Sequence, residues 1–230
     1  HTRFLPVSWA SEMCIRDRPK GCLNIVWGEP AKISDYLIRS PIVRKVSFTG
    51  SVPVGKQLAA LAGAHMKRVT MELGGHSPVL VFDDADVERA AEMLAKFKVR
   101  NAGQVCVSPT RFYVQEGAYE QFLARFSDVL KNIKVGDGLE AGTDMGPLAH
   151  ERRVPAMSAF IDDAKKHGGK VVVGGGPLDR KGFFFAPTVV TDLPDDSMLM
   201  TEEPFGPVAP VVRFKDTDEV LRRANSLPFG

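Results

Sequence analysis

Residues 45–73 read KVSFTGSVPVGKQLAALAGAHMKRVTMEL. This stretch holds two short apolar runs, at 45–48 and 68–73, and between them a helical pattern from about Pro53 to Ala64. A strand, a helix and a second strand in this order form the unit of a parallel sheet, because parallel neighbours need a long crossover connection. We therefore predict an α/β fold with a largely parallel sheet.

The same alternation of strand and helix patterns continues on both sides of this stretch. A Gly74–Gly75 break follows the second apolar run, and we expect a hinge between two domains there. Further strands are expected at 22–27, 78–82, 110–115, 170–173, 183–193 and 208–214, and helices at 86–101, 118–133, 150–167 and from 217 onward.

The composition excludes several classes of protein. Of the 230 residues, 44% are hydrophobic and 25% charged, which is typical of globular proteins and excludes a disordered or fibrous chain. No apolar run is long enough for a transmembrane helix, and a net charge of +2 gives no reason to expect a nucleic-acid or membrane partner. Cys14, Cys22 and Cys106 form neither a disulfide framework nor a zinc pattern. We therefore expect no metal and a cytoplasmic location, with Cys22 in the core.

Residues 1–18, HTRFLPVSWASEMCIRDR, follow neither a period of 2 nor one of 3.6. Residues 12–18 resemble translated sequencing-adapter sequence, which points to an artefact. The alternative is a genuine but irregular N-terminal arm. Residues 1–18 carry no functional prediction on either interpretation.

Residues 48–55, FTGSVPVG, place glycines and a serine at the junction of a strand and a helix. Gly50 lets a ligand approach the backbone, and the free amides after Ser51 attract a phosphate. Gly55 follows one turn later. The spacing from Gly50 to Gly55 is G-x-x-x-x-G, which lacks the middle glycine of the common dinucleotide fingerprint. A tight turn without a ligand is the alternative.

Glu72 lies at the end of an apolar strand, beside Gly74–Gly75. A carboxylate is costly to bury unless it is paired, and the glycines leave space around it. The position suits a general base, and a surface glutamate at a strand end is the alternative. We expect His76 to be a loop histidine rather than a catalytic one.

Cys106 lies in NAGQVCVSP, residues 101–109, a turn between a predicted helix and a predicted strand. Loops often carry function, and a thiol near free backbone amides can act as a nucleophile. A small buried apolar residue is the alternative.

Residues 202–207, EEPFGP, form a stiff segment with two adjacent carboxylates, because proline fixes φ and removes donors. Such a segment can present one carboxylate to a sugar diol, as acidic residues do in dinucleotide sites. A rigid surface turn with solvated charges is the alternative.

The order and spacing of four motifs resemble the aldehyde dehydrogenase superfamily from about residue 19 to residue 230. These motifs are Gly50-Ser51, Glu72-Leu73-Gly74-Gly75, Gln104-Val105-Cys106 and Glu203-Pro204-Phe205-Gly206-Pro207. The resemblance implies an aldehyde-dehydrogenase-like α/β fold: the C-terminal part of a Rossmann-type cofactor domain at 19–73, then a truncated α/β catalytic domain at 74–230. It also implies NAD or NADP as cofactor and a homodimer or homotetramer at full length.

The resemblance also assigns roles to residues. In this family a cysteine matching Cys106 attacks the aldehyde, and a hydride then passes to the nicotinamide. A glutamate matching Glu72 activates the water that releases the carboxylic acid. Glu203 matches the family residue that binds the ribose hydroxyls of the cofactor, and Phe205 matches a residue beside the nicotinamide. The turn that faces the cofactor matches Gly50, Ser51, Gly55 and Leu73.

Residues 98–106, KVRNAGQVC, look like succinate-semialdehyde dehydrogenases and related semialdehyde oxidisers. Arg100 matches an arginine that pairs with the substrate carboxylate in some of them. An arginine stabilised by the helix dipole is the alternative. The family's oxyanion-hole asparagine and adenine-ribose lysine lie upstream of Pro19, so we expect an incomplete, inactive portion of an enzyme and leave NAD versus NADP open.

Two other classes stay open. One is a cofactor-independent thiol hydrolase or esterase that uses Cys106 and Glu72, and binding of NAD(P) would exclude it. The other is a non-catalytic relative. The intact catalytic positions argue against this class.

Overall fold

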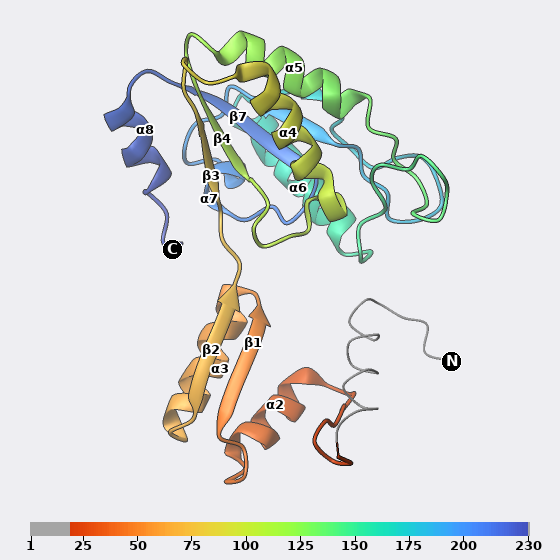
Figure 1. Ribbon diagram of the computed structural model, residues 1–230, viewed down its shortest axis with the longest axis vertical. Coiled ribbons are helices and arrows are strands. Elements are labelled where there is room, and N and C mark those ends of the chain that lie inside the picture. The colour runs from red at the N-terminus through yellow and green to blue at the C-terminus, as the bar shows by residue number, and fades with distance from the viewer. Residues whose placement is uncertain (1–18, 230) are drawn as a thin grey trace. The chain divides into compact units, whose positions relative to one another are not determined.

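The computed structural model describes residues 19–229, so the predictions for residues 1–18 lie outside it. Within this range the chain separates into two compact units, with the boundary between Leu73 and Gly74. Both units combine helices with strands, which confirms the predicted α/β class (Figure 1). No helix in the described range is long and apolar enough to cross a membrane.

The first unit is a βαβ crossover with one additional helix (Figure 1). Its two strands are parallel, and the register sets Gly50 beside Leu73. The crossover helix starts directly after the Gly50–Ser51 turn with a proline in its first turn, where a missing N–H costs nothing. In chain order the elements are α2 (Pro30–Arg39), β1 (Lys45–Gly50), α3 (Val52–Ala64) and β2 (Arg68–Leu73).

Two predictions for the start of this unit are wrong. Residues 22–27 form no strand, and Cys22 is exposed rather than in the core. An apolar run becomes a strand only where a neighbour takes up its backbone hydrogen bonds. The described sheet of this unit consists of β1 and β2 alone, and Trp27 is 89% exposed. Helix α2 was not predicted, although Pro30 in its first turn is a common start signal.

The second unit contains a five-stranded sheet in the order β3-β4-β7-β6-β5. Figure 1 labels β3, β4 and β7 of this sheet. All neighbours are parallel except β5 and β6, which confirms the predicted, largely parallel sheet. The strands are β3 (Pro78–Val81), β4 (Arg111–Gln115), β5 (Lys170–Val173), β6 (Thr188–Thr191) and β7 (Val208–Phe214). The helices are α4 (Val87–Val99), η1 (Arg100–Gly103), α5 (Tyr119–Lys131), α6 (Arg153–Lys166), α7 (Met198–Thr201) and α8 (Thr217–Ala224).

The core of the second unit forms around its central strands. Every residue of β6 is buried, and so is every residue of β7 except Arg213, as in a parallel sheet covered on both faces. Phe112 of β4 packs on Phe126 of α5, with 5.0 Å between ring centroids. The candidate site is built from segments that run into strands of this sheet.

The strand predicted at 183–193 extends only over Thr188–Thr191. The residues before it contribute one isolated bridge, between Phe185 and Pro177, because no regular strand lies alongside them. The short helix α7 was also not predicted, since a single turn leaves too few residues for a helical period.

Candidate active site

Three segments with candidate residues run into three adjacent strands of the second unit. The Gly74–Gly75 turn leads into β3, the Cys106 turn into β4, and residues 202–207 into β7. These strands are parallel neighbours, so the segments before them meet at the same edge of the sheet. Strand order therefore brings together residues that lie far apart in the sequence.

Cys106 lies in a turn whose backbone is shaped by Asn101, Ala102 and Gly103. Their φ values are 50°, 54° and 70°, so the chain leaves α4 in a left-handed turn that is unusual for alanine. The Asn101 side chain donates to the Gln104 carbonyl at 2.9 Å, and the Gln104 amide donates back to the Asn101 carbonyl at 3.1 Å. The thiol of Cys106 is exposed, which excludes the buried alternative and leaves it accessible to a substrate.

The Cys106 segment is packed directly against residues 202–207. A Cβ on Gly103 would lie 2.1 Å from the Gly206 carbonyl oxygen, and its φ of +70° also favours glycine. A Cβ on Gly206 would in turn lie 2.1 Å from the Met157 sulfur. The two backbones can approach this closely only because both positions are glycine.

Glu203 is the half-buried carboxylate of this site. Its Oε2 lies 2.1 Å from the point that a Cβ on Gly74 would occupy, so the glycine turn forms a cradle for the carboxylate. Burial raises the pKa of Glu203, while the backbone N–H of Gly75 and the charges of Arg153 and Lys98 oppose this rise. The neighbouring Glu202 is exposed, so only one of the two carboxylates belongs to the site.

Arg153 of α6 holds the backbone that follows Glu203. Its Nη2 donates to the Pro204 carbonyl at 2.5 Å and to the Phe205 carbonyl at 3.2 Å. Phe205 has a φ of +40° and an exposed fraction of 37%, so its ring is presented at the surface by a backbone that needs this support. Burial lowers the pKa of Arg153, and the carboxylate of Glu203 opposes that effect.

His76 is a loop residue, as predicted, but it is buried, with an exposed fraction of 2%. Its Nδ1 lies 2.8 Å from the Thr110 hydroxyl and its Nε2 lies 3.0 Å from the Leu199 carbonyl. A carbonyl can only accept, so Nε2 carries the proton and Nδ1 accepts from Thr110 in the neutral ring. Burial and the nearby Arg111 lower the pKa of His76 to about 3. The neutral ring thus joins the segment before β4 to the one before β7.

In the first unit, the cofactor-turn residues lie together where the two strands end. Gly50 pairs with Leu73 across the strands, and a Cβ on Gly55 would lie 2.5 Å from Leu73 Cδ2. The space beside Gly50 is filled by the Phe48 ring, 2.5 Å from the place of a Cβ, so Gly50 serves internal packing. The Ser51 side chain makes no capping bond, and no acidic residue lies in the first turn of α3. The start of this helix can therefore receive an anion.

Glu72 is exposed and pairs with Thr49, one residue before the end of β2. It is accessible to a reactant, and this position is equally compatible with the alternative of a surface glutamate at a strand end.

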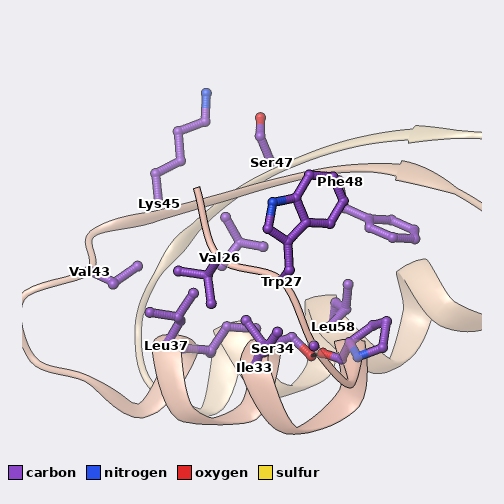
Figure 2. A pocket seen from close by; sticks show the side chains of 14 residues that line it. Val26, Trp27, Ile33, Ser34, Leu37, Val43, Lys45, Ser47, Phe48 and Leu58 are labelled. Atoms are coloured by element: carbon purple, nitrogen blue, oxygen red, sulfur yellow. Dashed lines mark hydrogen bonds between the residues drawn. The ribbon is translucent and has the colours of Figure 1, made fainter. Parts of the chain in front are cut away.

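The first unit contains a cavity of about 500 Å³, which the sequence analysis did not predict (Figure 2). Figure 2 shows Trp27 and Phe48 on one side of this cavity and Ile33, Leu37 and Leu58 on the other. The lining is mainly apolar, so the cavity suits an apolar group rather than a phosphate.

Arg100 follows α4 directly and is exposed. It lines a surface hollow of about 680 Å³ together with Met93 and Phe97 of α4 and Asp144. A guanidinium at the rim of an apolar hollow can bind a ligand that carries both an anion and a hydrocarbon part.

The residues that sequence reasoning missed are Arg153, Arg111 and Lys98. Arg111 is buried, and its Nε donates to the His76 carbonyl at 2.9 Å. No motif marks Arg153 or Arg111, because their partners lie in distant segments, whereas Lys98 stands in the quoted segment 98–106 and on the buried stripe of α4. Within residues 19–229, no three acidic, histidine or cysteine side chains come together as a possible metal site.

Comparison with known proteins agrees with this arrangement. The model of the aldehyde dehydrogenase family matches residues 7–230. The chain is 45% identical to 4-(hydroxymethyl)benzenesulfonate dehydrogenase TsaD1 of Comamonas testosteroni, and the match covers 94% of the chain and 44% of that protein. It is 42% identical to the succinate-semialdehyde dehydrogenase (NADP+) GabD of Escherichia coli, over 96% of the chain and 46% of that protein.

Among solved structures, the crystal structure of an E. coli NADP dependent enzyme has a TM-score of 0.93 and 42% identity. That match covers 96% of this chain and 46% of the other. The chain thus spans slightly less than half the length of the relatives it matches. A family match across nearly the whole chain, together with the fold, shows that the chain belongs to the aldehyde dehydrogenase family.

Proposed function

We propose that the protein oxidises an aldehyde to the carboxylic acid with NAD or NADP, and that this chain contributes the nucleophile, the base and the ribose-binding carboxylate. The observation that carries the proposal is the close packing of the exposed Cys106 turn on the Glu203 segment through Gly103 and Gly206. In this function residues 19–73 belong to the cofactor domain and residues 74–230 to the catalytic domain. The whole protein acts in the cytoplasm as a homodimer or homotetramer.

The residues present fit a dinucleotide. The uncapped start of α3 behind Ser51 suits a pyrophosphate, because free amides and the helix dipole attract an anion. The Glu203 carboxylate, held in its glycine cradle, suits the two hydroxyls of a ribose. Gly50, Gly55 and Leu73 shape the turn before α3, and the exposed Phe205 ring offers a face to the nicotinamide. When bound, the cofactor accepts the hydride that leaves the substrate carbon.

The chain's own residues account for the remaining bond changes. The Cys106 sulfur attacks the aldehyde carbon, so a carbon–sulfur bond forms and the carbonyl oxygen takes the negative charge. After hydride loss the product is a thioester on Cys106. Glu72 takes a proton from water, the resulting oxygen nucleophile attacks the thioester, and the carbon–sulfur electron pair returns to Cys106. The products are a carboxylic acid and the free thiolate.

The substrate we propose is a semialdehyde such as succinate semialdehyde. Arg100 would bind its carboxylate, and Phe97 and Met93 beside it would contact the hydrocarbon part. The similarity to the succinate-semialdehyde dehydrogenase of E. coli supports this substrate class.

The nucleophile can be tested in the whole protein with Cys106→Ala. We expect loss of NAD(P)H formation from succinate semialdehyde, while Cys22→Ala, which removes the other exposed thiol of residues 19–229, leaves the rate within about twofold of wild type. Ester hydrolysis by Cys106 without any binding of NAD(P) would instead favour the thiol hydrolase. A Cys106→Ala protein that still oxidises aldehydes would contradict the proposal.

The substrate class can be tested with Arg100→Met. Loss of a charge-assisted hydrogen bond should raise KM for succinate semialdehyde by about 10-fold or more, with little change for propanal. Arg89→Met, at an exposed position of α4, the helix that Arg100 follows, is the matched control. Equal effects on both aldehydes would rule out carboxylate recognition by Arg100.

A further inference from the structure

Arg153, the first residue of α6, is half-buried beside the segment 202–207 and has no role in the proposed bond changes. Its Nη2 donates to two successive carbonyl oxygens, at 2.5 Å to that of Pro204 and at 3.2 Å to that of Phe205. Hydrogen bonds from a charged guanidinium are stronger than those between neutral groups. The backbone around Phe205 is therefore held more firmly than a neutral side chain could hold it.

The two carbonyls belong to the peptide groups on either side of Phe205. Because each peptide group is planar, the orientations of these two groups define the φ and ψ angles of Phe205. Its φ of +40° lies in the left-handed region, which is costly for a bulky side chain and persists only where the surroundings impose it. The guanidinium thus stabilises an otherwise unfavourable conformation of Phe205.

The direction of the Phe205 ring follows from this backbone conformation. The φ and ψ angles set the direction of the Cα–Cβ bond relative to the flanking chain, and the ring extends from that bond. Because the residue is 37% exposed, contacts with the protein interior enclose the ring only in part. The backbone that Arg153 holds therefore decides where the ring points.

The start of α6 is itself connected to the Cys106 turn. The side chain of Gln104 in that turn is buried, and its Oε1 accepts from the Ala149 N–H at 3.0 Å. Ala149 lies four residues before Arg153 in the chain. The hydrogen bonds of Gln104 and Arg153 thus link the turn that carries the proposed nucleophile to the backbone of Phe205.

We propose that Arg153 is a positioning residue that holds the Phe205 ring where the nicotinamide ring of the cofactor binds, at a fixed place relative to the Cys106 turn. This role rests on the proposed function, because it presumes that Phe205 contacts the nicotinamide. Arg153 acts through the Phe205 backbone, so its effect concerns the aromatic ring of the cofactor and not the sugars and phosphates.

The first test compares, by titration calorimetry of the whole protein, the binding of NAD(P)⁺ with that of ADP-ribose, with or without the 2′-phosphate. The two ligands share the sugars and phosphates, and only the first carries the nicotinamide. Arg153→Met should weaken binding of NAD(P)⁺ by about fivefold or more, and that of ADP-ribose by less than about twofold. Arg153→Lys, which can still donate to a carbonyl, should bind NAD(P)⁺ with an affinity between those of Arg153→Met and wild type.

The matched control is Arg152→Met, at the exposed neighbouring position, which should leave both affinities unchanged. In a Phe205→Leu background Arg153→Met should have no further effect, since the ring on which it acts is gone. A further loss in that background, equal weakening of both ligands, no weakening of either, or an Arg153→Met protein that does not fold would overturn the proposal and make Arg153 merely structural.

A second measurement needs no cofactor. A fluorinated phenylalanine incorporated at position 205 reports on the surroundings of the ring by ¹⁹F NMR. Arg153→Met should shift or broaden its signal, whereas Arg152→Met should not, and an unchanged signal in Arg153→Met would overturn the proposal. If wild type binds neither NAD(P)⁺ nor ADP-ribose, the proposed function fails, while the NMR signal still decides whether Arg153 positions Phe205.

Discussion

At the scale of single residues, the site depends on glycines, which have no Cβ atom, as much as on charged side chains. Gly74 and Gly103 lie where a Cβ would collide with Glu203 and with the Gly206 carbonyl. Glycines in a sequence look like simple breaks, yet Gly74 and Gly103 each set the distance between two segments of the site.

Gly74→Ala should weaken NAD(P) binding by about tenfold, the equivalent of one charge-assisted hydrogen bond. The reason is that its Cβ would lie 2.1 Å from Glu203 Oε2 and displace the carboxylate. Gly75→Ala is the control, because open space surrounds that position and its N–H is kept. Binding titrations of both variants measure the difference, and equal affinities would contradict the cradle.

His76 predicts a loss of stability in acid. Its pKa is about 3 in the folded chain and 6.5 when unfolded, so between these values only the unfolded state binds the proton. Stability therefore falls as pH drops below 6.5, by about 1.4 kcal/mol per pH unit from this residue, or about 2 kcal/mol at pH 5.

Urea unfolding between pH 6.5 and 4 should show a shallower pH dependence in His76→Gln than in wild type. Parallel curves for the two proteins would show that His76 is not held neutral by burial.

At the scale of elements, the alternation of strands and helices was predictable because it depends on local patterns. The strands at 68–73, 170–173 and 208–214 have the predicted bounds, and helix α4 starts at its predicted cap, where the Asp86 carboxylate accepts from the Arg89 N–H at 3.2 Å. The prediction of a strand at 22–27 is wrong because strand formation also requires a neighbouring strand, and no local pattern shows whether one is present.

Helix α3 provides a matched pair of glycine substitutions. Gly63→Ala should stabilise the first unit by about 0.5–1 kcal/mol, because its position is helical and open. Gly55→Ala should destabilise it by about 1–3 kcal/mol, because the new Cβ would lie 2.5 Å from the Leu73 side chain. Hydrogen exchange of the α3 amides measures both, and changes of the same sign would refute the packing of α3 on β2.

At the scale of the whole molecule, the two units differ in how much core they contain. The buried hydrophobic cluster extends from Val81 to Val220, entirely within the second unit. In the described part of the first unit, Ile38 and Ala62 are the buried hydrophobic residues.

Residues 74–230 should consequently fold alone and melt cooperatively, whereas residues 19–73 alone should not form a stable fold. A two-stranded sheet with two helices buries too little apolar surface to offset the loss of chain entropy. Calorimetry and circular dichroism of the two separate chains test this expectation. A cooperative transition in 19–73 would show that the small unit is independently stable.

The sequence by itself determined the order of strands and helices, the α/β class and the chemical identity of the candidate residues, because local spacing and side-chain type carry that information. Only the tertiary structure decided that Cys106 is exposed, that Gly103 packs on Gly206, that Arg153 donates to the backbone after Glu203, and that His76 joins Thr110 to Leu199. The physical reason is that these contacts join residues from different parallel strands and their helices. Their energies depend on burial and on the close approach of distant segments, which no local pattern encodes.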